Sequence, residues 1–169
     1  MQLKIPMKTK IFEFDPVIYP FQLQVCKYIP GVTASEIAER YVQVVDRHTA
    51  QVFSTDDLIA NPTLKAKTLC VLQKDTDEMK YLVILYRPKK IRWGTVSHES
   101  LHVLTMLGDW LGFTPPKVQD DEPHAYFLAW VANCIGSIID GRPDAMKGKL
   151  LTFDRNETEK NSSDAGGQD

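Results

Sequence analysis

Strand-forming segments dominate the first half of the chain, and two long helical patterns dominate the second half. The apolar runs typical of strands cover residues 10–29, 50–53, 67–73 and 80–86. The helical patterns cover residues 95–111 and a segment that begins near 120–122 and ends near Asp140. This order predicts an α+β domain, with helices packed on one face of a mostly antiparallel sheet.

One shorter helix interrupts the strands. Thr33 and Glu36 are spaced as a capping box, which favours a helix from Thr33 to about Arg47. The apolar residues that would form its buried side are Ile37, Tyr41, Val44 and Val45. Further along, the acidic segment 74–78 separates two apolar runs and predicts a hairpin loop between two strands.

Composition and charge exclude several classes of protein. The chain has 169 residues, of which 43% are hydrophobic, as expected of one globular domain. Its net charge of −2 and the lack of a basic stripe argue against nucleic-acid binding. The longest apolar run, 125–139, is too short to span a bilayer. We therefore expect no nucleic-acid or membrane partner, and the sequence leaves the oligomeric state open.

The cysteines indicate the cellular compartment, and the C-terminal residues indicate where the folded domain ends. Cys26, Cys70 and Cys134 lie far apart in apolar contexts, which is typical of reduced core thiols in a cytoplasmic protein. Residues 154–169 include no large apolar side chain, so they cannot offset the entropy lost on ordering. The sequence therefore predicts a folded domain over 1–153 and a disordered polar tail over 154–169.

The clearest chemical signature is an HExxH pattern formed by His98, Glu99 and His102. On a helix, residues four apart stack on one face, so both imidazoles could bind one zinc ion. A glutamate directly after the first histidine can take a proton from a metal-bound water and pass it to a leaving amine. Chance alone would give this pattern in roughly one of two hundred chains of this composition.

A catalytic zinc site needs a third protein ligand. Glu122 is the candidate, because a returning helix that begins there could bring its first turn back to the metal. Asp109 lies two helical turns beyond His102, about 10 Å along the axis, which is too far to share the metal comfortably. Asp120 and Asp121 are more consistent with capping the helix, although one of them or His124 could replace Glu122 as the ligand.

Tyr126 is a second candidate catalytic residue, beside Glu99. It lies one helical turn after Glu122 and would share its face of the helix. Its hydroxyl could donate a hydrogen bond to the oxyanion of a tetrahedral intermediate. The alternative is a tyrosine that packs in the core or in a lid.

Residues 93–103 and 120–130 together resemble the zincin metallopeptidases whose third zinc ligand is a glutamate on the next helix. More narrowly, they are similar to small predicted metallopeptidases of phages and prophages, in which an Asp-Glu-x-x-Ala-Tyr helix follows the HExxH helix. The resemblance implies a small zincin-like domain with a gluzincin-like site. In that site His98, His102 and Glu122 bind Zn²⁺ and Glu99 is the base. It also implies a phage- or prophage-encoded protein in the cytoplasm of a bacterial host.

These observations predict a zinc-dependent hydrolase, most consistent with a peptidase that acts on a peptide or protein substrate. Glu99 would serve as general base for a metal-activated water. The strand predicted at 80–86 would hold an extended peptide by edge pairing. The alternative is a non-catalytic, zinc-containing module for regulation or phage–host interaction, in which no general base is needed.

Overall fold

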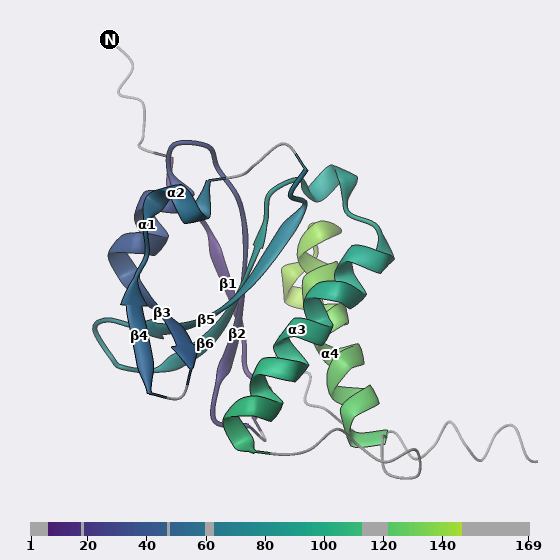
Figure 1. Cartoon of the computed structure of the whole chain (residues 1–169). Helices are drawn as coiled ribbons and strands as arrows, with labels where there is room; N and C mark the ends of the chain where they lie inside the picture. The colour runs from purple at the N-terminus through teal and green to yellow at the C-terminus, as the bar shows by residue number, and fades with distance from the viewer. Residues whose placement is uncertain (1–6, 18, 47, 60–62, 113–121, 147–169) are drawn as a thin grey trace, which may run out of the picture.

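The computed structural model describes residues 7–17, 19–46, 48–59, 63–112 and 122–146. Within these ranges the chain forms a six-stranded sheet, four α-helices and two short 3₁₀ helices (Figure 1). The strands are β1 (Ile11–Phe14), β2 (Gln22–Lys27), β3 (Tyr41–Asp46), β4 (Thr49–Val52), β5 (Ala66–Gln73) and β6 (Met79–Leu85). The helices are α1 (Thr33–Arg40), α2 (Thr55–Leu58), α3 (Trp93–Leu111), α4 (Glu122–Ile139), η1 (Pro88–Lys90) and η2 (Pro143–Met146). The predicted α+β class is confirmed, whereas the predicted domain end at residue 153 and the polar tail lie outside the described residues.

The strands follow the order β1-β2-β6-β5-β3-β4 across the sheet. Four of the five neighbouring pairs are antiparallel, and the pair of β2 with β6 is parallel. β5 and β6 form the hairpin that the acidic segment 74–78 predicts, with Thr68 opposite Val83. The sheet is therefore mixed, and mostly antiparallel as expected.

β6 lies inside the sheet and is buried on both of its faces. Successive residues of this strand, and Tyr86 just beyond its end, point alternately into two separate cores. The core under α3 and α4 takes Tyr81, Val83 and Leu85, and the core under α1 and α2 takes Leu82, Ile84 and Tyr86. Figure 1 shows these two helix layers on opposite sides of the sheet. The expectation that the helices share one face is therefore wrong, because an uninterrupted apolar strand needs cover on both sides.

The helix predicted from Thr33 to about Arg47 ends at Arg40, and the following residues form β3. Tyr41–Gln43 pair with Val71–Gln73 of β5. Three of the four residues of the expected apolar stripe, Tyr41, Val44 and Val45, therefore lie in a strand. This segment is rich in valine, and the branched side chain of valine favours a strand. The edge of β5 offers such a strand a partner to pair with. Tertiary pairing therefore overrides the local helical pattern.

The N-terminal segment is tied to α1 by side chains that were expected to cap that helix. Glu36 Oε2 accepts a hydrogen bond from the Thr9 amide at 2.8 Å, and the hydroxyls of Thr9 and Thr33 lie 2.9 Å apart. The side chain of Thr33 also accepts a hydrogen bond from the Ile29 amide. The predicted capping box is therefore wrong, because both of its side chains bond to other segments.

A buried lysine lies near the start of β6. Lys80 is 3% exposed, and its ammonium donates hydrogen bonds to Gln22 Oε1 at 2.5 Å and to Glu78 Oε2 at 2.9 Å. Gln22 is the residue opposite Lys80 in the parallel ladder between β2 and β6. A buried ammonium is tolerated when its donors are paired in this way, so Lys80 is a fixed polar point on an otherwise apolar strand.

The three cysteines are buried free thiols, as predicted. Burial raises the pKa of the Cys70 thiol to about 11 and that of Cys26 to about 12. Both thiols therefore stay protonated near neutral pH.

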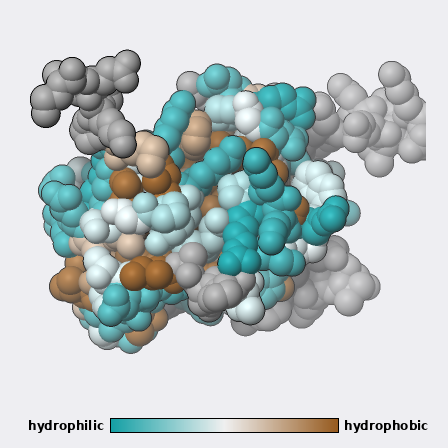
Figure 2. Space-filling model, turned by 90° about the horizontal axis from the view of Figure 1, so that it is seen from above, coloured by the Kyte–Doolittle hydropathy of each residue, from teal (hydrophilic) through white to brown (hydrophobic). Residues whose placement is uncertain are grey.

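The surface is mostly polar on the face that Figure 2 shows, which is the upper end of the molecule in Figure 1. Hydrophilic residues predominate there, and the apolar residues form separate patches. None of the helices that the structure describes combines the length and the apolar character needed to cross a membrane.

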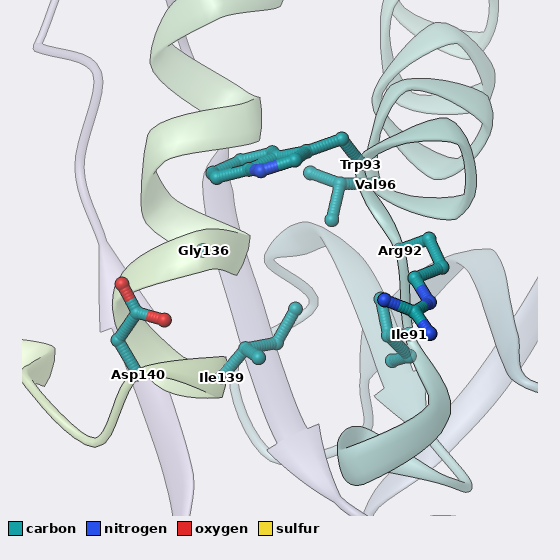
Figure 3. A pocket seen from close by; sticks show the side chains of 7 residues that line it. All are labelled: Ile91, Arg92, Trp93, Val96, Gly136, Ile139 and Asp140. Atoms are coloured by element: carbon teal, nitrogen blue, oxygen red, sulfur yellow. The ribbon is translucent and has the colours of Figure 1, made fainter.

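α3 and α4 run antiparallel, and the first residue of α3 packs on the second half of α4. The Trp93 indole lies across Gly136 (Figure 3), where a Cβ on the glycine would be 3.5 Å from the indole Cη2. Beside this contact is a cavity of about 210 Å³, with Ile91, Val96 and Ile139 among its lining residues.

Replacing Gly136 with alanine is expected to raise the free energy of unfolding by about 0.5–1 kcal/mol. Alanine is favoured over glycine within a helix by about that amount, and the new methyl group would meet Trp93 at an ordinary van der Waals distance. Chemical denaturation of the variant and the wild type checks this. Gly136→Leu is the matched control, because its larger side chain would have to displace the indole, and its stability is expected to fall.

Candidate metal centre

The residues of the HExxH pattern lie on α3, a regular helix of 19 residues. Val96, Val103 and Leu107 face the core and hold this helix against the sheet. Gly112 ends the helix in the left-handed conformation, with φ of 74°, which glycine adopts without strain. The helix predicted over 95–111 is therefore present, and it begins two residues earlier, after Arg92 rather than at a side-chain cap.

His98 and His102 form an exposed pair of imidazoles on α3. Their Nε2 atoms are 3.1 Å apart, and the two ring planes are at 85° with centroids 4.5 Å apart. Two nitrogens bound to one tetrahedral zinc at 2.0–2.1 Å would be separated by about 3.3 Å. The spacing and the exposure of the pair therefore fit two of the ligands of a zinc ion.

The histidine pair points away from α4. Trp93 marks the side of α3 that faces α4, because its indole lies on Gly136. At about 100° per residue, His98 lies about 140° and His102 about 180° around the helix axis from Trp93. A metal bound to both imidazoles would therefore lie on the far side of α3 from α4.

Glu122 is the exposed first residue of α4. Measured from the contact between Trp93 and Gly136, Glu122 lies about 21 Å along α4, whereas His102 lies about 13.5 Å along α3. The carboxylate is thus displaced from the pair both along the helices and around α3. The structure brings His98 and His102 together, but it does not bring Glu122 to them.

No other acidic or thiol group takes the place of the third ligand in the part of the chain that the structure describes. There, no three side chains of histidine, cysteine, aspartate or glutamate are grouped so that they could hold a metal ion. Asp109 and His124 lie in the described part and belong to no such group. Asp120 and Asp121 lie outside it. The fit to a zinc site is therefore partial, with two nitrogen donors in place.

Glu99 is turned toward the sheet. It is 4% exposed, and the hydroxyl of Thr68 on β5 donates a hydrogen bond to its Oε2 at 2.6 Å. The same hydroxyl lies 3.4 Å from the main-chain oxygen of Glu99. A short bond of this kind is typical of a hydroxyl that donates to a carboxylate, so Glu99 has the partner that a buried acid requires.

Sequence reasoning missed Thr68. It is 8% exposed and points toward α3 from a strand whose next residues on that face, Ala66 and Cys70, are small or apolar. The only local signal for this contact is a single polar residue on the buried face of a strand. Thr68 and Glu99 are 31 residues apart in the sequence, so no local pattern predicts that they meet.

Tyr126 lies on the second turn of α4 and is 41% exposed. It is on the helix that the histidine pair faces away from, so the structure does not bring its hydroxyl to the pair. Its role as an oxyanion donor stays a prediction.

The strand expected to pair with a substrate is not at an edge. β6 lies between β2 and β5, so the prediction that 80–86 offers a free edge is wrong. β5 packs against α3, and its ladder with β3 covers only Val71–Gln73. On that side, residues 66–70 pair with no other strand among the described residues. Four of these five residues are buried, and Lys67 is half-buried.

Comparisons with protein-family models, with curated proteins and with solved structures found no match. The resemblance to zincins therefore rests on the sequence motifs alone and stays a prediction.

Proposed function

We propose that this protein is a zinc-dependent hydrolase that cleaves peptide bonds, with His98 and His102 as two of its metal ligands. The observation that carries the proposal is the 3.1 Å spacing of the two exposed Nε2 atoms on α3. Two imidazoles directed at one point on a helix surface have no evident packing role, and neutral imidazole is a preferred zinc ligand.

The proposal assigns the third ligand position to Glu122. Glu122 is exposed, and it is the first residue described after Gly112. The first turn of α4 would have to move along and around α3 to reach the pair, so metal binding and this movement would occur together.

Zinc bound at such a site lowers the pKa of a water molecule and polarises the scissile carbonyl. Glu99 would take the proton from the water and later give it to the leaving amine. Tyr126 would donate a hydrogen bond to the carbonyl oxygen as negative charge develops there.

A second candidate function is a non-catalytic module that binds zinc for regulation or for interaction with a host protein. The observation that favours it is the burial of Glu99 and its hydrogen bond to Thr68. These give the glutamate a structural use that requires no reaction.

Measuring the zinc content of the wild type and of Glu122→Ala tests the proposal. The wild type, purified without a histidine tag, is expected to hold about one zinc per chain. The alanine variant is expected to bind zinc at least tenfold more weakly, because a carboxylate ligand is lost. Glu39→Ala is the matched control, since Glu39 is an exposed acid on α1 and far along the chain from the pair.

Equal zinc binding by Glu122→Ala and the wild type would exclude Glu122 as a ligand. A wild type that binds no zinc would contradict both candidate functions.

A further inference from the structure

The contact between Thr68 and Glu99 joins β5 to the proposed base. We propose that Thr68 is a positioning residue, which holds the Glu99 carboxylate by one oxygen and leaves the other oxygen for the reacting water. This inference rests on the proposed hydrolase function. It goes beyond that function by assigning a role to a strand residue outside the HExxH pattern.

The first support is the geometry of the bond. The Thr68 hydroxyl and Glu99 Oε2 are 2.6 Å apart, and both residues are more than nine-tenths buried. Away from water, a bond of this length between a hydroxyl and a carboxylate is strong and directional. It therefore restricts the rotation of the glutamate side chain.

The second support is the rigidity of the donor. Thr68 lies within the β5–β6 hairpin, opposite Val83, and its branched side chain has few allowed rotamers. Its neighbours on the same face, Ala66 and Cys70, are also buried. A donor fixed on a paired strand can hold a helix side chain more accurately than a loop residue could.

The third support is the oxygen that remains. The hydrogen bond from Thr68 goes to Oε2 of the Glu99 carboxylate, which leaves Oε1 for a second partner. Glu99 and His102 are three residues apart, which places their side chains about 60° apart around α3 and one turn apart along it. Glu99 therefore extends from the part of α3 next to His102, and its Oε1 is the oxygen assigned to the reacting water.

Thr68→Val tests the inference, because valine has nearly the same shape and lacks the hydroxyl. We expect kcat to fall by about 10- to 100-fold, as when a residue that orients an active-site group is removed. KM and the zinc dissociation constant are expected to stay within about twofold of the wild type, because neither substrate nor metal contacts the hydroxyl. Thr68→Ser is expected to restore kcat to within about threefold. Thr105→Val, on the exposed side of α3, is the matched control.

A second readout does not depend on activity. The melting temperatures of wild type, Thr68→Val, Glu99→Leu and the double variant form a thermodynamic cycle. We expect Thr68→Val to lower the melting temperature in the wild-type background, because it removes the hydrogen-bond donor of a buried carboxylate. The same substitution is expected to have little effect when Glu99 is already leucine. Equal effects in the two backgrounds would overturn the inference.

The outcomes separate the inference from the function on which it rests. Activity is tested with fluorescein-labelled casein and with a mixed library of fluorogenic peptides. A peptide that is cleaved in the library then serves to measure kcat and KM. An active wild type whose kcat is unchanged by Thr68→Val would overturn the role of Thr68 alone, since the residue would then be only a structural tie. A zinc-loaded wild type that cleaves neither substrate would overturn the proposed function, and the positioning role with it.

Discussion

Replacing His98 or His102 with alanine is expected to reduce the affinity for zinc by more than 100-fold. Each imidazole supplies one of the two nitrogen donors of the pair, and among the described residues no third histidine, cysteine or acid joins them in a metal-binding group. Competition of each variant with a chromophoric zinc chelator measures the loss.

The structure offers a close control for this experiment. His48 is an exposed histidine at the turn between β3 and β4, and His48→Ala is expected to bind zinc as the wild type does. Both helix variants should keep their melting temperature without metal, because the two imidazoles are exposed. Unchanged zinc affinity in either helix variant would rule out the pair as a metal centre.

Glu99→Gln is expected to lower kcat by about 10³-fold while zinc stays bound. General base catalysis contributes about 10²- to 10⁴-fold, and glutamine cannot take a proton from water. The amide oxygen of glutamine can still accept the hydrogen bond from Thr68, so the fold should be retained. Turnover of a fluorogenic peptide and the zinc content of the same sample measure the two effects together.

The glutamine variant also distinguishes the two candidate functions. Substantial turnover in Glu99→Gln would show that another group is the base. A wild type that holds zinc and cleaves no peptide would favour the non-catalytic module, in which Glu99 only ties α3 to β5.

The sequence predicts the elements whose local pattern agrees with their final environment. The helical pattern over 95–111 and the hairpin around 74–78 are both present, because periodicity and turn composition specify them without distant partners. The segment after Arg40 was misassigned for the opposite reason. Its valines allow either a helix or a strand, and pairing with β5 decides between them.

The sequence predicts only the part of the candidate site that lies on a single helix. His98 and His102 are four residues apart, so their approach follows from helix geometry alone. The partner of Glu99 is 31 residues away on another element, and no periodicity reveals it. The position of Glu122 depends on how α4 packs along α3. The relative translation and rotation of two packed helices cannot be derived from the sequence pattern.

The buried ammonium of Lys80 has a consequence for how β6 finds its alignment. A slip of one residue along a neighbouring strand exchanges the two faces of β6, and both faces are apolar, so hydropathy alone barely penalises the wrong alignment. The same slip would carry the ammonium of Lys80 away from Gln22 on β2, whereas Glu78, two residues earlier in the chain, would move with it. The buried charge would then lose one of its two acceptors, at a cost in free energy. The hydrogen bond between Lys80 and Gln22 across the two strands therefore favours a single alignment, where a wholly apolar strand would tolerate two.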